Sequence, residues 1–276
     1  MIDEILQYTN LQDAGREIQR NQTKHRMKLA DIWGIPEGAR VLEIGCGQGD
    51  TTAVLAHLVG ENGFVHGIDI ASADYGAPLT LGQATEQLLQ SRIGGRLQID
   101  LNTDFLSDTF KPDVMYDCFV MSHCSWYFSS IDEVINVLKK ARQMAKKLCF
   151  AEWDVRLRLP EQSAHFFSVL IQAQCACFAP IPDSNIRTLL TPEDTMSAAR
   201  QAGWRIVNTA TVFSPDLQDG KWETEFLLSE YPGILSTLDT MPEKLKSMLL
   251  SFVAMVGTQH DIEAMPLNTC VFSADA

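Results

Sequence analysis

The chain has 276 residues, of which 46% are hydrophobic, and a formal net charge of −13 at pH 7. This length suits one α/β domain with insertions. The negative charge disfavours nucleic acid or an anionic membrane as the main partner, because both require a positively charged surface. We therefore expect a small-molecule substrate, no nucleic-acid partner and no stable membrane association.

The seven cysteines are an odd number without C-x-x-C pairing, which predicts a reducing compartment and no zinc site. The first residues lack the basic start and apolar core of a signal peptide, and no apolar run approaches the ~20 residues that span a membrane. We expect a cytoplasmic protein without a bound metal. Its oligomeric state is left open by the sequence, and a homodimer is one option.

The first predicted element is an amphipathic helix from Glu17 to Trp33, in which His25 and Leu29 recur near the helical period. A turn at 36–38 then leads the chain into its first strand. We expect this helix to cover the mouth of a ligand site.

The most informative segment follows this turn. Val41–Ile44 is typical of a buried strand, and it breaks into a glycine turn at 45–49 that opens a helix. Gly45 and Gly47 can adopt backbone angles that a Cβ forbids, and the missing side chains at Gly47 and Gly49 let a ligand lie against the main chain. The pattern predicts a nucleotide-type pocket.

A carboxylate follows at the spacing of a ribose-binding acid. Asp69 ends a second predicted strand, 63–70, about twenty residues beyond the last glycine, and we expect it to accept both ribose hydroxyls. Asp50 stands where a dinucleotide fingerprint has its third glycine, and a carboxylate at a helix N-terminus repels a pyrophosphate. The preferred ligand is therefore a nucleoside without phosphates.

Glu43, Gly45, Gly47 and Gly49 match the pattern E/D-x-G-x-G-x-G residue by residue. This pattern resembles the first motif of class I S-adenosylmethionine-dependent methyltransferases, where it wraps the methionine part of the cofactor. The resemblance covers 41–154 with specific motifs and the remainder by element order. It implies S-adenosylmethionine as cofactor and a Rossmann-like, doubly wound, seven-stranded α/β sheet with its last strand antiparallel.

The third predicted strand, Arg96–Leu101, ends near Asp104 and Phe105. In similar methyltransferases an acidic or amide residue here meets the adenine amino group and its neighbour packs on the ring, so the resemblance implies these roles. A helix cap and a core phenylalanine are the alternative. The expected cofactor contacts are Glu43, Gly45, Cys46, Gly47, Gly49, Asp69, Ile70, Asp104, Phe105 and Ser122.

The fourth predicted strand, Tyr116–Met121, delivers the segment 122–128 at its carboxyl end, the edge where ligands bind in open α/β sheets. His123 is the best-placed imidazole for a general base, with a free pKa of ~6.5. The alternative is a structural histidine packed between the cofactor loop and the next helix. Trp126 and Tyr127 are expected to contact the substrate, Tyr127 being the preferred contact.

The fifth predicted strand, Lys147–Asp154, carries Glu152 at its end. Glu152 is expected to position a substrate, or to serve with Asp154 as an acid/base pair, or else to cap the next element. An insertion at 155–190 is typical of a helical lid, on which His165 is a further expected substrate contact.

The remaining predicted elements complete the sheet and add a second insertion. They are a helix from Pro192 to Gly203, a strand at 204–213, a largely helical segment at 222–257 and a strand at 268–273. We expect one methyltransferase domain, 1–276, with an N-terminal helical cover at 1–35, a cofactor-binding core at 36–154 and helical insertions at 155–190 and 222–257.

The expected reaction is transfer of the methyl group of S-adenosylmethionine to an O, N or C atom of a small molecule by in-line displacement. The alternatives are a nicotinamide-dependent oxidoreductase, which Asp50 disfavours, and a cofactor-binding protein without turnover. The runs at 74–84 and 122–128 also resemble methyltransferases labelled cyclopropane-fatty-acyl-phospholipid synthase-like. That label implies methylene transfer to lipid alkenes, and the acidic composition favours a small-molecule acceptor instead.

Overall fold

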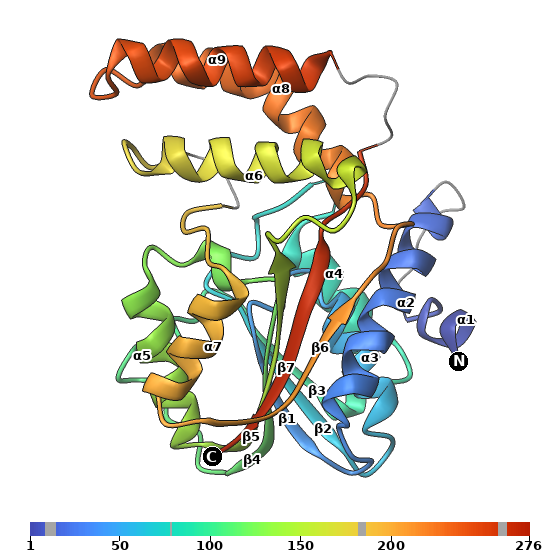
Figure 1. Ribbon diagram of the computed structural model, residues 1–276. Coiled ribbons are helices and arrows are strands. Elements are labelled where there is room, and N and C mark those ends of the chain that lie inside the picture. Colours follow the sequence, from blue (N-terminus) through green and yellow to red (C-terminus); the bar gives the residue numbers. More distant parts are fainter. Residues whose placement is uncertain (9–14, 78, 182–185, 259–263) are drawn as a thin grey trace.

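The computed structural model describes residues 1–276 except 9–14, 78, 182–185 and 259–263 (Figure 1). Its strands form one seven-stranded sheet in the order β3-β2-β1-β4-β5-β7-β6. The first five strands pair in parallel, and β7 runs antiparallel between β5 and β6. This confirms the predicted sheet. The strands are β1 Arg40–Ile44, β2 Phe64–Ile68, β3 Leu97–Asp100, β4 Tyr116–Ser122, β5 Ala145–Asp154, β6 Arg205–Val212 and β7 Asn268–Asp275.

Helices cover both faces of this sheet and also lie beyond the carboxyl ends of its parallel strands (Figure 1). The helices are α1 Ile2–Ile5, α2 Arg16–Trp33, α3 Asp50–Leu58, α4 Leu81–Gln90, α5 Ile131–Arg142, α6 Ser163–Ala176, α7 Pro192–Gln201, α8 Asp219–Thr237 and α9 Glu243–Gly257. One face packs on α2, α3 and α4, and the other packs on α5 and α7. Helices α6, α8 and α9 stack as a further layer beyond the carboxyl end of β5 (Figure 1). None of the helices in the described ranges is long and apolar enough to cross a membrane.

Local sequence explains where the helices begin and end. The Thr191 side chain accepts a hydrogen bond from the Asp194 amide and Pro192 occupies the first helical position, so α7 starts where predicted. Ser130 caps α5 in the same way. Gly34 ends α2 in the left-handed region, with φ 60°.

Several predicted boundaries differ from the structure. The third strand begins at Leu97 because the range Gly94–Arg96 forms a 3-10 turn. Helix α8 begins at Asp219, before the predicted helical segment at 222–257. The part of the predicted lid at 182–185 and the part of the N-terminal cover at 9–14 lie outside the described residues.

Candidate active site

The glycine turn between β1 and α3 adopts left-handed backbone angles at Gly45, Gly47 and Gly49, with φ of 68°, 52° and 84°. A Cβ on Gly45 would lie 2.8 Å from the Cβ of Cys124, and a Cβ on Gly49 would overlap Leu88. The absent side chain of Gly49 thus makes room for α4 and not for a ligand, which corrects the reason expected for this glycine. A Cβ on Gly47 would meet no described atom within 4 Å. Gly47 is therefore where the loop borders open space.

Asp69 is fixed directly beside this loop. The amide of Gly47 donates to Oδ2 of Asp69 at 2.8 Å, and the amide of Ala71 donates to Oδ1 at 2.8 Å. A carboxylate has ~4 acceptor positions, so Asp69 retains capacity for two ribose hydroxyls. The neighbouring Ile70 is 72% exposed and offers an apolar surface for a base. The cradle at Gly47 and this carboxylate fit S-adenosylmethionine.

Two of the expected cofactor residues lie beneath the loop. Thr52 Oγ1 donates to Glu43 Oε2 at 2.6 Å, which ties β1 to α3, and burial raises the pKa of Glu43 to about 8. Cys46 is also buried, and a Cβ on Gly67 would lie 3.1 Å from the Cβ of Cys46. The side chains of Glu43 and Cys46 therefore support the loop from inside the fold.

Asp104 and Phe105 are neighbours in sequence but differ in burial. Phe105 is buried and packs against Phe110 and Phe119. Asp104 is exposed, and its Oδ1 accepts a hydrogen bond from the amide of Leu106 at 2.8 Å. These positions match the turn-capping acid and core phenylalanine that the sequence left as the alternative.

His123 follows β4, and one polar side chain lies beside each nitrogen of its ring. Its φ is 50°, a value that non-glycine residues rarely adopt. Its Nε2 lies 3.1 Å from Nε2 of His25 on α2, and its Nδ1 lies 3.5 Å from Oε1 of Glu152. His25 Nδ1 in turn lies 3.0 Å from Oγ of Ser214. Burial lowers the pKa of His25 to about 2, so this imidazole is neutral.

Glu152 is an acceptor for several donors at once. Its Oε2 accepts from the amide and the hydroxyl of Ser125 at 2.9 and 2.7 Å, and its Oε1 accepts from the amide of Trp153 at 3.0 Å. Because all these partners donate, the geometry suits an ionised carboxylate. Asp154 instead pairs with Arg156 through two bonds of 2.8 Å. The expected acid/base pair of Glu152 and Asp154 is therefore not formed, because Asp154 is engaged elsewhere.

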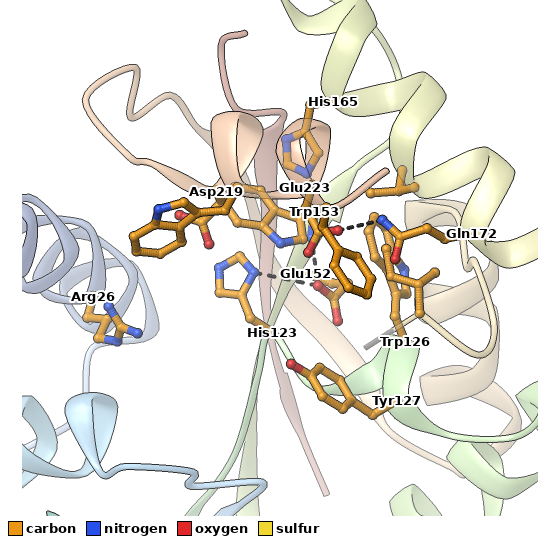
Figure 2. A pocket seen from close by; sticks show the side chains of 14 residues that line it. Arg26, His123, Trp126, Tyr127, Glu152, Trp153, His165, Gln172, Asp219 and Glu223 are labelled. Atoms are coloured by element: carbon orange, nitrogen blue, oxygen red, sulfur yellow. Dashed lines mark hydrogen bonds and ion pairs between the residues drawn. The ribbon is translucent and has the colours of Figure 1, made fainter. Parts of the chain in front are cut away.

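His123 and Glu152 line a cavity of about 440 Å³ (Figure 2). Its walls come from α2, the segment after β4, the carboxyl end of β5, helices α6 and α8, and Ile186 between α6 and α7. A cavity of this size is typical of small-molecule sites. The expected site residues that line it are His123, Trp126, Tyr127, Glu152 and His165.

Other lining residues were not predicted as site residues. They are Arg26 on α2, Val169 and Gln172 on α6, Ile186, Trp153, and Asp219, Trp222, Glu223 and Phe226 on α8. They come from three separate helices and two other segments of the chain, and the four on α8 recur at i, i+3, i+4 and i+7, so they share one helix face. This spacing is the signal that could have found the α8 residues, but it begins at Asp219, before the helical segment expected at 222–257.

Known proteins are similar to this chain in sequence and in fold. A family model described as a methyltransferase domain matches residues 42–148, and one described as protein-L-isoaspartate(D-aspartate) O-methyltransferase matches residues 3–75. The crystal structure of a cyclopropane-fatty-acyl-phospholipid synthase-like protein from Lactobacillus casei is 34% identical, with a TM-score of 0.90 over 100% of this chain and 98% of that one. The chain belongs to the class I S-adenosylmethionine-dependent methyltransferases.

More distant relatives of the chain are also named as methyltransferases. Methyltransferase phomM' from Diaporthe leptostromiformis is 26% identical over 71% of this methyltransferase and 60% of that protein, and methyltransferase phomM is 25% identical over the same shares. The chain thus spans about 60% of the length of these curated relatives. The family model and these relatives support a methyltransferase of this class with S-adenosylmethionine as cofactor, and the oxidoreductase alternative is not favoured.

Proposed function

We propose that this methyltransferase transfers the methyl group of S-adenosylmethionine to an O, N or C atom of a small molecule by in-line displacement, with His123 as the general base. The observation that carries this proposal is the position of His123 on the wall of a cavity beside the glycine loop. A Cβ on Gly45 would lie 2.8 Å from the Cβ of Cys124, the residue after His123, so the loop packs against the segment that carries His123. The proposed division is a cofactor side at Gly47, Asp69, Ile70 and Ser122, and an acceptor side in the cavity.

When bound, S-adenosylmethionine supplies a sulfonium methyl that is already activated for displacement. The protein then needs to hold the nucleophile in line, about 3 Å from the methyl carbon, and to exclude water. Helices α6 and α8 close one side of the cavity, and Trp222 on α8 is 47% exposed at its wall. These helices are the proposed water-excluding cover.

The hydrogen positions that make His123 a base follow from its two partners. The facing Nε2 atoms of His25 and His123 share one hydrogen. We assign this hydrogen to His123, and the hydrogen of His25 to Nδ1, from which it is donated to Ser214. Nδ1 of His123 then keeps a lone pair that has no hydrogen-bond partner among the described residues. When it accepts a proton from the nucleophile, the imidazolium lies beside the Glu152 carboxylate, which stabilises the positive charge.

The character of the cavity supports a small polar acceptor. Imidazole, carboxylate and amide groups share its walls with aromatic rings. A long acyl chain would leave those buried polar groups unpaired, which is costly. A small molecule with both polar and apolar parts fits this lining better.

Labelled methyl transfer tests the proposal. The protein is incubated with S-adenosylmethionine carrying a trideuterated methyl group and a metabolite extract, and products are sought by mass spectrometry. We expect an acceptor that gains one labelled methyl, and a His123→Asn variant that forms it ~10²–10⁴-fold more slowly while binding S-adenosylhomocysteine normally. Binding of S-adenosylhomocysteine without any labelled product would instead support a cofactor-binding protein without turnover.

A further inference from the structure

Helix α6 places two fully buried polar side chains on the cavity wall. His165 and Gln172 are both 0% exposed, and both line the cavity. Among the described residues, Nε2 of His165 and Oε1 of Gln172 have no hydrogen-bond partner. Buried polar atoms in proteins are normally paired, so these two atoms point to a ligand that supplies the missing partners.

The neighbours of His165 and Gln172 determine whether each unpartnered atom is a hydrogen-bond donor or an acceptor. The amide of Leu267 donates to Nδ1 of His165 at 2.9 Å, and burial lowers the pKa of His165 to about 3. His165 is therefore neutral with its hydrogen on Nε2, and it presents a donor. Gln172 Nε2 donates to Oε2 of Glu223 at 2.5 Å, so Oε1 of Gln172 presents an acceptor.

Glu223 adds a carboxylate next to this acceptor. In the described ranges no lysine, arginine or histidine forms an ion pair with it. Burial raises the pKa of Glu223, and Asp219 raises it further. A bound cation would compensate for this desolvation, because an opposite charge favours the ionised carboxylate.

The other residues that line the cavity favour a positively charged ligand. Glu152 and Asp219 also line it, and Arg26 is the one arginine or lysine among the lining residues. Arg26 is already engaged, because it donates to Gln22 at 2.6 Å and lies 3.5 Å from the Asp50 carboxylate beside the glycine loop. Trp222, Phe226 and Trp126 add aromatic rings to the same walls, and aromatic faces attract cations.

We infer that His165, Gln172 and Glu223 form a subsite for a protonated amine carried by the methyl acceptor, with an oxygen of the same molecule opposite His165. This inference rests on the proposed function, since it names the class of acceptor. An ammonium group has three donors and no acceptor, which matches the Glu223 carboxylate and the Gln172 oxygen. Glu223 and Gln172 hold the amine as an anchor, and the nucleophilic atom lies at His123.

Three phenols of similar shape test the charge preference. Tyramine carries an ammonium group, 4-(2-hydroxyethyl)phenol replaces it with a hydroxyl, and 3-(4-hydroxyphenyl)propanoate carries a carboxylate. Their binding to the protein loaded with S-adenosylhomocysteine is measured by calorimetry at neutral pH. We expect tyramine to bind at least ~10-fold more tightly than the alcohol, as a hydrogen-bonded charge pair would provide, and the propanoate to bind most weakly.

Two matched variants on α8 test whether Glu223 causes the preference for tyramine over the alcohol. Glu223→Gln keeps the size and the contact with Gln172 but removes the charge, and it should bring tyramine to within about threefold of the alcohol. Glu225→Gln changes an exposed acid that pairs with Lys221, and it should leave the preference intact. Melting temperature and S-adenosylhomocysteine affinity check that both variants are folded.

The outcomes separate this inference from the proposed function. No detectable binding of tyramine at millimolar concentration, or a preference that Glu223→Gln leaves unchanged, overturns the amine subsite even if labelled methyl transfer to some other acceptor succeeds. Charge-selective binding that depends on Glu223 supports the subsite even if no labelled product forms, and in that case the methyl-transfer proposal fails alone.

Discussion

Nε2 of His25 and Nε2 of His123 lie 3.1 Å apart, although 98 positions separate them in the chain. Helix α2 brings His25 to this point, and the Trp33 indole on the same helix donates to the carbonyl of Phe150 in β5 at 3.1 Å. The His25 ring also stacks on Trp153 with an interplanar angle of 10°. The hydrogen positions of the proposed base thus depend on a helix that precedes the whole nucleotide-binding core.

Replacing His25 with phenylalanine should lower kcat at least ~10-fold with little change in the KM for S-adenosylmethionine. The ring would still pack, but His123 would lose the partner that fixes its hydrogen. His25→Gln keeps a polar group near His123 and should retain more activity than His25→Phe. Steady-state kinetics across a pH series measures both. Equal loss in the two variants, with an unchanged pH profile, would show that His25 only packs.

Asp69→Ala should weaken cofactor binding by ~1–3 kcal/mol, because charge-assisted hydrogen bonds to the ribose are lost. Calorimetry with S-adenosylhomocysteine measures this change. Asp74→Ala is the matched control, since Asp74 is an exposed acid in the loop that follows. Wild-type affinity in Asp69→Ala would reject the ribose assignment.

Alanine at Gly47 and at Gly49 should produce different defects. Both changes strain a left-handed backbone by ~1–2 kcal/mol, but only the Gly49 variant also overlaps Leu88. We expect Gly49→Ala to be the less stable protein, and Gly47→Ala to fold while losing cofactor affinity by ~1–3 kcal/mol through overpacking against the ligand. Urea unfolding and calorimetry measure the two effects. A Gly47→Ala variant with normal affinity would argue against the open cradle.

Glu43 should make the free energy of unfolding depend on pH. Its pKa is raised from 4.5 to about 8 in the folded state, so the folded protein holds a proton that the unfolded chain releases. Stability from this group is fully present below pH 4.5 and is lost as pH rises toward 8, by up to ~1.4 kcal/mol per pH unit. Glu43→Gln should flatten this decline, whereas Glu61→Gln, at an exposed acid, should not. Urea unfolding at several pH values decides between these outcomes.

The sheet was predictable because its signals are local. The central strands β1, β2 and β4 are short apolar runs, and the β1–β2, β2–β3 and β4–β5 crossovers each contain one α-helix. Because parallel crossovers are right-handed, element order leaves few topologies. The glycine turn and Asp69 were predictable for the same reason, since backbone freedom and a fixed spacing express their roles in one stretch of chain. The antiparallel β7 came from the family resemblance and was confirmed.

The residues that line the cavity were only partly predictable. His123 and Tyr127 follow a strand, and strand ends can be placed from sequence. His25, Gln172 and Glu223 lie on helices whose faces are turned toward the cavity only by tertiary packing. The helical period of α2 indicated a buried His25, but it did not show which residue His25 would meet.

The helical layer of α6, α8 and α9 has a hydrophobic core of its own, which includes Ile171, Leu227 and Leu249. Gln172 and Glu223, which border the cavity, belong to this layer, whereas Gly47 and Asp69 belong to the sheet. In the proposed function, evolution can therefore alter the acceptor contacts made by this helical layer without altering the nucleoside contacts at Gly47 and Asp69. The same division gives protein engineers a place to begin when they seek new acceptors.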